Sequence, residues 1–146
     1  MKLYKIYNNI IPFEGYLAIT VWPWVFIRKD CADKYDDTAH RHETTHALQQ
    51  VECLLLGLAI TAILLVLGCG WWSLIPIGFF FEWYLLEWLI KVVLCFFANR
   101  DAYYSISFEQ EAFEHEEEVS YNEIRKDFEW IKYIFKLKKR RRKYEV

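Results

Sequence analysis

Polar and apolar residues separate along this chain into blocks, and the longest apolar block lies in the middle. No charged residue occurs from Cys53 to Phe81. Within that block, GCGWWSLIPIG at 68–78 combines glycine, serine and proline, which interrupt regular structure. No proline separates the block from the polar residues before it. The pattern therefore predicts one helix over 37–67, apolar from about residue 51, and a second over 76–98, joined as a hairpin.

The first thirty residues show a different pattern. The segment YLAITVWPWVFIRK at 16–29 is rich in β-branched and aromatic residues and contains Pro23. It predicts a β-rich segment over 1–30, with either two short strands bent near Pro23 or one strand with this proline at an edge. The polar loop that follows ends in three candidate caps for the long helix: Asp36, Asp37 and Thr38.

Polar residues return after residue 98. The segment 98–107 is expected to be a loop, with Ser105 or Ser107 as the cap of an acidic helix that begins FEQEAFEHEEE. Apolar residues then recur three and four positions apart, as on one face of an amphipathic helix: Tyr121, Ile124, Phe128, Ile131 and Phe135. We expect helices over 106–137, followed by a basic tail at 138–146.

Composition narrows the class of protein. The 146 residues are 55% hydrophobic and 19% aromatic, with a net charge of −2, which is too apolar for a disordered chain. Four cysteines without CxxC spacing are expected to be free thiols, as in a reducing compartment: Cys31, Cys53, Cys69 and Cys95. The expected fold is a single domain over 1–146, mainly α with a small β element (α+β).

The segment HETTH at 42–46 carries the clearest candidate chemistry. His42 and His46 are four residues apart, so on a helix their imidazoles point the same way and can bind one Zn²⁺. Glu43 follows the first histidine, in the position of a general base for a zinc-bound water. The expected cofactor is one zinc ion per chain.

A catalytic zinc site needs a third protein ligand and one open position. His40 is two residues from His42 and faces away from it on a helix. The position six residues after His46, where one extended form of the motif has a histidine, is Glu52. The remaining candidates lie downstream, in FEQEAFEHE: Glu109, Glu111 and His115.

HETTH followed by a glutamate on a later helix resembles the gluzincin metallopeptidases. The resemblance implies that Glu109 completes the metal site, with Glu111 as the alternative. Several gluzincin families have Glu, two residues, Ala and Asp at this point, and here Phe113 replaces the Asp. Glu111 could then take over the role of orienting a histidine. A tyrosine or histidine often stabilises the oxyanion or supports the site, and the candidates are Tyr103, Tyr104 and His115.

A narrower resemblance covers most of residues 11–133. Five segments are similar to segments of small metallopeptidase-like proteins of Bacteroidetes and their phages. They are PFEGYLAITVWPWVFIRKD, HETTHALQQ, EWYLLEWLIK, AYYSISFEQEAFEHE and YNEIRKDFEWIKY. The resemblance implies a zincin-like helical core. The apolar hairpin would be inserted between the HExxH helix and the glutamate-bearing helix.

The hairpin is a candidate membrane anchor. Its first helix is near the lower limit of about 17 apolar residues for crossing a bilayer core. Trp71 and Trp72 stand at its tip, as interfacial anchors do. Glu87 and Lys91 can pair on one face of the second helix and should face the partner helix, water or another subunit. The alternative is the buried core of a soluble oligomer.

Charges flank the hairpin and are missing from its tip at 68–78. Basic residues occur on both sides: Arg28, Lys29, Lys34, Arg41 and Arg100. The positive-inside rule then predicts the cytoplasmic (inner) membrane, with the site on the cytoplasmic side. The basic tail is expected to contact anionic lipid rather than nucleic acid.

Together these features predict a membrane-anchored zinc metallopeptidase. Its substrate would be a peptide or protein segment, held in extended form along a strand within 19–27. The alternative is a non-catalytic membrane protein with a structural or sensory zinc site, working as a homo-oligomer.

Overall fold

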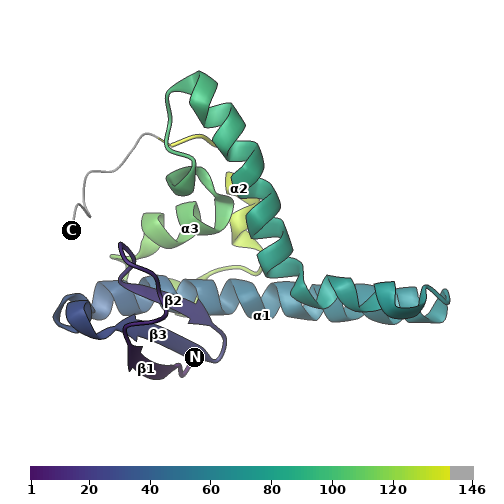
Figure 1. The fold of residues 1–146 in the computed structure, drawn as a ribbon, viewed down its shortest axis with the longest axis horizontal. Helices are drawn as coiled ribbons and strands as arrows, with labels where there is room; N and C mark the ends of the chain where they lie inside the picture. Colours follow the sequence, from purple (N-terminus) through teal and green to yellow (C-terminus); the bar gives the residue numbers. More distant parts are fainter. Residues whose placement is uncertain (139–146) are drawn as a thin grey trace.

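The computed structural model describes residues 1–138, so the predicted basic tail lies outside the described residues except for Lys138. The fold is mainly helical with one small sheet (Figure 1), and the predicted α+β class is confirmed at this level. The long helix α1 (Asp37–Val66) forms the base, with the sheet against its N-terminal half. Helix α3 (Ser107–His115) also contacts α1, and α2 (Phe79–Ala98) leads away from it (Figure 1).

The sheet contains β1 (Tyr4–Asn8), β2 (Ala18–Val21) and β3 (Trp24–Arg28). Its order is β1-β3-β2, with β1 parallel and β2 antiparallel to β3. The prediction of two strands on either side of Pro23 is therefore confirmed. Burial of Val25 and Ile27 against Ala47 attaches the sheet to α1, because removing such side chains from water is the main force in packing.

Helix α1 begins where the sequence indicated. Of the three candidate caps, Asp36 is the N-cap, and its carboxylate accepts a hydrogen bond from the backbone N–H of Ala39 at 2.8 Å. Within residues 1–138, α1 is the one helix long and apolar enough to cross a membrane by length and composition. Its most apolar window has a mean hydropathy of 1.9, and 33% of that window is buried. The predicted side of the membrane stays a prediction.

The apolar hairpin differs in part from the prediction. The return segment is a 3₁₀ helix, η2 (Gly70–Gly78), which packs along the distal half of α1. A Cβ at Gly57 would lie 1.9 Å from the carbonyl oxygen of Pro76, so the absence of a side chain permits this close approach. Helix α2 begins at Phe79 and turns away from α1 (Figure 1), so it is not the antiparallel partner that we expected.

The helices predicted over 106–137 are shorter than expected. Three short elements follow α3 or precede it: η3 (Tyr103–Ser105), α4 (Tyr121–Ile124) and η4 (Glu129–Tyr133). The prediction of a continuous amphipathic helix from Tyr121 onward was wrong. Arg125 ends α4 with an extended backbone, and its guanidinium forms ion pairs with Glu52 and Glu111. Phe128 then has a φ of 57°, a left-handed conformation that a helix cannot contain.

The cap predicted for α3 was also wrong, because the N-cap residue is Ile106 and no side chain of the helix's own segment caps it. The carboxylate of Glu87, on α2, accepts hydrogen bonds from the backbone N–H of Ser107 at 3.0 Å and from its hydroxyl at 2.5 Å. The four cysteines are free thiols, as predicted.

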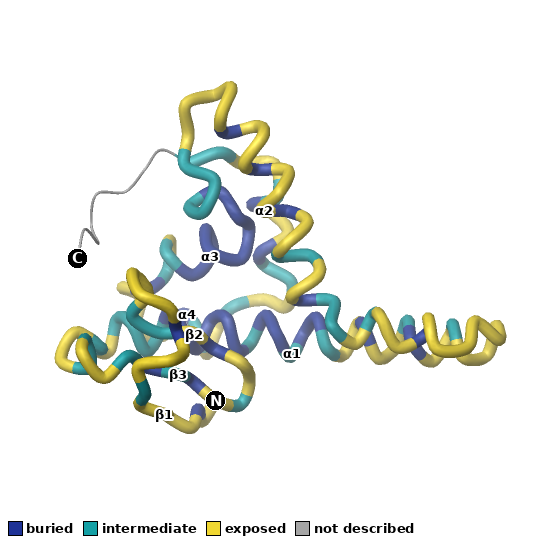
Figure 2. Tube along the Cα trace, in the orientation of Figure 1, coloured by how far each residue is buried: buried dark blue, intermediate teal, exposed yellow. Residues whose placement is uncertain are grey.

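Burial follows a clear division of the molecule (Figure 2). The N-terminal half of α1, α3 and the inner side of α2 are buried, whereas the distal half of α1, η2 and the outer side of α2 are exposed. The largest core cluster joins these elements through Cys53, Phe80, Ile106, Phe108 and Trp130. The site described next lies beside this cluster.

Candidate metal centre

Three side chains that the sequence singled out meet between α1 and α3. Two of them, His42 and His46, lie one turn apart on α1, and Glu109 lies in the first turn of α3. The two Nε2 atoms are 3.1 Å apart, and the Glu109 carboxylate oxygens lie 3.5 Å from the first and 3.6 Å from the second. All three residues are buried.

These separations suit one metal ion. Ligand atoms about 2.0–2.1 Å from a tetrahedral zinc are roughly 3.3 Å from one another. One carboxylate oxygen of Glu109, Oε2, is buried and has no hydrogen-bond partner among the described residues. A buried oxygen without a partner is costly, and a cation between the three groups would satisfy it. The group could therefore hold a metal ion, and imidazole and carboxylate donors suit several divalent transition metals, zinc among them.

Both histidines are oriented so that Nε2 is the free nitrogen. The Nδ1 atom of His42 lies 3.2 Å from a carboxylate oxygen of Glu116, and that of His46 lies 2.9 Å from Oε1 of Gln49. Because these oxygens accept hydrogen bonds, each Nδ1 carries a proton, and Nε2 is the nitrogen that would bind a metal after losing its own proton. Two Nε2 atoms and a carboxylate then converge on one point.

Sequence reasoning missed Glu116 and Gln49. Glu116 is seven residues after Glu109 and directly follows α3, and a helical spacing of seven could have indicated it. Gln49 is three residues after His46 on the same helix. Glutamine is common on helices, so nothing in its position marked it.

Glu111 does not belong to the three-residue group. It is fully buried, and its carboxylate accepts hydrogen bonds from Arg125 at 2.7 Å, Tyr121 at 2.9 Å and the Gln49 amide at 3.0 Å. It therefore acts on His46 through Gln49, one step further from the histidine than the orienting role that we expected. The sequence could not distinguish Glu109 from Glu111 by chemistry, but the fold places only Glu109 between the two histidines.

The electrostatics of the group favour positive charge. Burial alone would lower the pKa of His42, but the nearby carboxylates of Glu109 and Glu116 outweigh it and raise this pKa to about 10. The same balance raises the pKa of His46. Burial alone would raise the pKa of Glu109, but the nearby histidines hold it far below its usual range. A metal cation would take the place of these protons.

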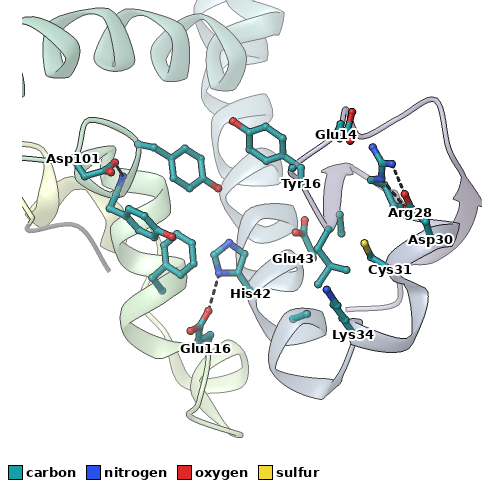
Figure 3. A pocket seen from close by; sticks show the side chains of 17 residues that line it. Glu14, Tyr16, Arg28, Asp30, Cys31, Lys34, His42, Glu43, Asp101 and Glu116 are labelled. Carbon is teal, nitrogen blue, oxygen red and sulfur yellow. Dashed lines mark hydrogen bonds and ion pairs between the residues drawn. The ribbon is translucent and has the colours of Figure 1, made fainter. Parts of the chain in front are cut away.

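Glu43 is buried beside the two histidines. One of its carboxylate oxygens accepts a hydrogen bond of 2.7 Å from the hydroxyl of Thr20, on β2. The carboxylate points into a cleft next to His42 (Figure 3). The sheet therefore fixes the side chain that the motif predicts to be the base.

The cleft has a volume of about 560 Å³. The N-terminal segment with β2 and β3 forms one side of it, and α3 with the segment before it forms the other (Figure 3). Tyr16 and Tyr103 contact each other across it, with ring centroids 6.1 Å apart. Tyr104 also lines the cleft and packs against Phe113. Burial and the charge of Glu109 raise the pKa of Tyr103 well above its usual value.

Strand β2 is an edge strand, and part of its outer edge faces this cleft. Gln50 donates to the carbonyl of Thr20 at 2.8 Å and accepts from the backbone N–H of Trp22 at 2.7 Å. Because alternate residues of a strand share a side, Ala18 has its backbone groups on the same outer edge as Thr20. Ala18 lines the cleft.

The remaining candidates lie elsewhere. His115 stacks on Tyr121 at 3.8 Å and contacts Glu118, so it is not near the three-residue group. His40 contacts the hydroxyl of Tyr35 at 3.0 Å and faces away from His42, as expected from the spacing. Tyr84 of α2, which the sequence did not indicate, donates a hydrogen bond to Glu109 at 3.0 Å.

Comparison of the chain with protein-family models, with curated protein sequences and with solved structures finds no match.

Proposed function

We propose that this protein is a membrane-anchored zinc metallopeptidase of zincin-like, gluzincin type. The observation that carries the proposal is the meeting of His42, His46 and Glu109 at distances suited to one tetrahedral ion. The resemblance of HETTH and the later glutamate to gluzincins supports it. The cleft beside His42 supports it further, because a catalytic site keeps one position open to water and substrate.

In this proposal, zinc at the site would acidify a water molecule and polarise the carbonyl of the scissile peptide bond. Glu43 accepts the proton from that water and passes it to the leaving amine, as a general base and then a general acid. The hydrogen bond from Thr20 orients the carboxylate for this transfer. Tyr103, which faces the cleft and stays protonated because its pKa is raised, is placed to donate a hydrogen bond to the oxyanion.

The proposed substrate is an extended peptide segment. The outer edge of β2 at Ala18 offers a backbone N–H and carbonyl that can pair with such a segment. Gln50 occupies the carbonyl of Thr20 and the N–H of Trp22, so the available edge is short and lies beside Glu43. A short edge fits a substrate that contributes only a few residues around the scissile bond.

In the structure the apolar hairpin consists of the distal half of α1 and the 3₁₀ helix η2. We propose that this hairpin anchors the site to the cytoplasmic membrane. Large apolar side chains are exposed along it, including Leu55, Ile63, Val66, Trp71 and Trp72. The residues buried between α1 and η2 are small or polar: Gly57, Thr61 and Ser73. Aliphatic residues outside and small polar residues inside are typical of helices packed in lipid. Orientation with the site in the cytoplasm remains the proposal drawn from the flanking charges.

The alternative of a structural or sensory zinc site would favour a fourth protein ligand. Within residues 1–138, the metal group consists of three side chains. The cleft next to it therefore favours the hydrolase.

The decisive comparison uses Glu43→Gln and His46→Ala. Purified Glu43→Gln should keep about one zinc per chain and lose hydrolysis of a peptide library, because only the proton acceptor is removed. His46→Ala should lose zinc. Zinc-loaded wild-type protein that cleaves no bond in a broad peptide library and in membrane-protein substrates would contradict the peptidase proposal.

A further inference from the structure

Helix α2 has its polar and apolar faces reversed relative to a helix in water. Its buried positions include Glu87 and Lys91, and its exposed positions are almost all large and apolar. Leu85, Leu89 and Val93 are 56%, 51% and 56% exposed. The single exposed charge between 79 and 98 is Glu82, in the first turn. A helix facing water would show the opposite pattern, so the outer face requires an apolar partner.

The buried face of α2 holds the segment that carries Glu109. Tyr84 donates a hydrogen bond to the Glu109 carboxylate at 3.0 Å. Three residues further along α2, Glu87 caps the N-terminus of α3 through both polar groups of Ser107. The ring of Phe108, which lies between Ser107 and Glu109 in the sequence, stacks on Phe80 with ring centroids 4.5 Å apart. Residues 107–109 are thus contacted in turn by side chains of α2.

Contacts continue to the far end of the helix. Lys91 donates to the carbonyls of Ile134 and Lys136 at 2.6 and 2.8 Å, and Cys95 contacts Ser105 at 3.5 Å. Because other segments of the chain pack along its inner face, with hydrogen bonds at Ser107, Ile134 and Lys136, α2 cannot cross a bilayer unless those polar groups also enter the hydrocarbon. It can lie at the surface of a bilayer, with only its outer face in contact with lipid.

Two further observations select lipid as the partner. Large apolar side chains are exposed both along α2 and along the hairpin, and α2 turns away steeply from the hairpin (Figure 2). If the hairpin enters the bilayer along its normal, α2 lies roughly parallel to the surface. At the tip of the hairpin, Trp71 and Trp72 are 88% and 75% exposed, as residues of a membrane interface are.

We infer that α2 is an interfacial helix that couples membrane contact to the metal site. Its outer face binds the lipid bilayer, and its inner face positions Glu109 through Tyr84 and through the Glu87 cap on α3. By linkage, any lipid contact that favours the docked position of α2 strengthens metal binding, and metal binding strengthens lipid contact equally. This inference rests on the proposed metal site and not on peptide hydrolysis.

The test measures zinc affinity by chelator competition, with full-length protein in vesicles of phosphatidylcholine and phosphatidylglycerol. Leu89→Glu puts a charge on the lipid face, at a residue that is 51% exposed. It should weaken zinc binding roughly 5–150-fold, the usual range of coupling between two sites. The matched control is Val119→Glu, the same kind of change at a residue that is 80% exposed outside α2, and it should leave zinc affinity unchanged.

Tyr84→Phe tests the inner face without altering the lipid face. It should weaken zinc binding about 10–100-fold, as loss of a partner of a metal ligand does, while vesicle binding is kept. Hydrogen exchange at residues 107–109 should slow when vesicles are added to the wild-type protein and should not slow in Leu89→Glu. Measured on the metal-free protein, this readout does not depend on metal loading.

Equal zinc affinity for wild type, Leu89→Glu and Tyr84→Phe would overturn the inference. A second result would also overturn it: zinc affinity that does not depend on lipid, together with a changed oligomeric mass in Leu89→Glu. A second copy of the chain, and not lipid, would then cover α2. Zinc-binding protein that behaves as expected here but hydrolyses no peptide would disprove the proposed function alone.

Discussion

Replacement of Gln49 by leucine, compared with a matched control, separates the role of this residue in metal binding from its role in packing. The side chain is fully buried, accepts a hydrogen bond from Nδ1 of His46, and donates to the Phe108 carbonyl and the Glu111 carboxylate. In Gln49→Leu, the tautomer and the ring orientation of His46 are no longer held. Changes of this kind typically cost 10–100-fold in metal affinity, which is about 1.4–2.7 kcal/mol.

The same substitution also lowers the stability of the fold. It leaves the Phe108 carbonyl and one oxygen of Glu111 without the amide donor, and each buried unpaired group costs about 1–3 kcal/mol. A loss of folding alone could therefore imitate a loss of metal affinity. A control with a similar cost in stability but no contact with a histidine is required.

Gln50→Leu is that control. Gln50 is the next residue on α1, is also buried, and loses two hydrogen bonds to β2, with Thr20 and Trp22. Chelator competition at a temperature where both variants are folded should show weak zinc binding for Gln49→Leu and nearly wild-type binding for Gln50→Leu. Thermal unfolding should be lowered in both. Equal zinc affinities of the two variants would refute the role assigned to Gln49.

Four further predictions concern particular residues. Because the pKa of His42 is raised to about 10, zinc must displace its proton at neutral pH; zinc affinity should rise between pH 7 and 10, and a flat calorimetric profile would contradict this. The same shift stabilises the metal-free protein below pH 6.5, and that contribution should be lost as pH rises through about 10, which thermal unfolding measures. Gly57→Ala should lower the unfolding temperature, by a cost of about 1–3 kcal/mol, because its Cβ would meet the carbonyl of Pro76; an unchanged temperature argues against the packed hairpin. In inside-out membrane vesicles, a water-soluble maleimide should label Cys31, beside the cleft, and not Cys69, at the hairpin tip; labelling of Cys69 from that side would reverse the proposed orientation.

Local signals along the chain were sufficient for α1 and the β2–β3 pair. Both depend on residues close in sequence: a capping Asp36 before an uninterrupted helical segment, and Pro23 between two β-rich runs. The structure after Tyr121 could not be predicted in this way. Its spacing of apolar residues was helical, but Arg125 forms ion pairs with Glu52 and Glu111, which lie 73 and 14 residues away. Long-range pairing of a buried charge overrode the local pattern.

The residues of the site also differ in whether local sequence signals could identify them. His42, Glu43 and His46 followed from their spacing, and Glu109 followed from the gluzincin resemblance. Glu116 and Tyr84 reach the site from outside the motif, 74 residues from His42 and 25 residues from Glu109. Their contribution depends on how α2 and α3 pack, which no spacing within one helix encodes.

In the proposed site, one zinc ion is held by His42, His46 and Glu109, with a fourth position open to the cleft. X-ray absorption spectroscopy of the zinc-loaded protein measures this directly, together with anomalous diffraction at the zinc edge. We expect one zinc per chain with two nitrogen ligands at about 2.0–2.1 Å and oxygen ligands at about 2.0–2.2 Å, and a spectrum that changes in Glu109→Gln. Zinc bound through sulfur, zinc bound away from α1, or a spectrum unchanged in Glu109→Gln would contradict it.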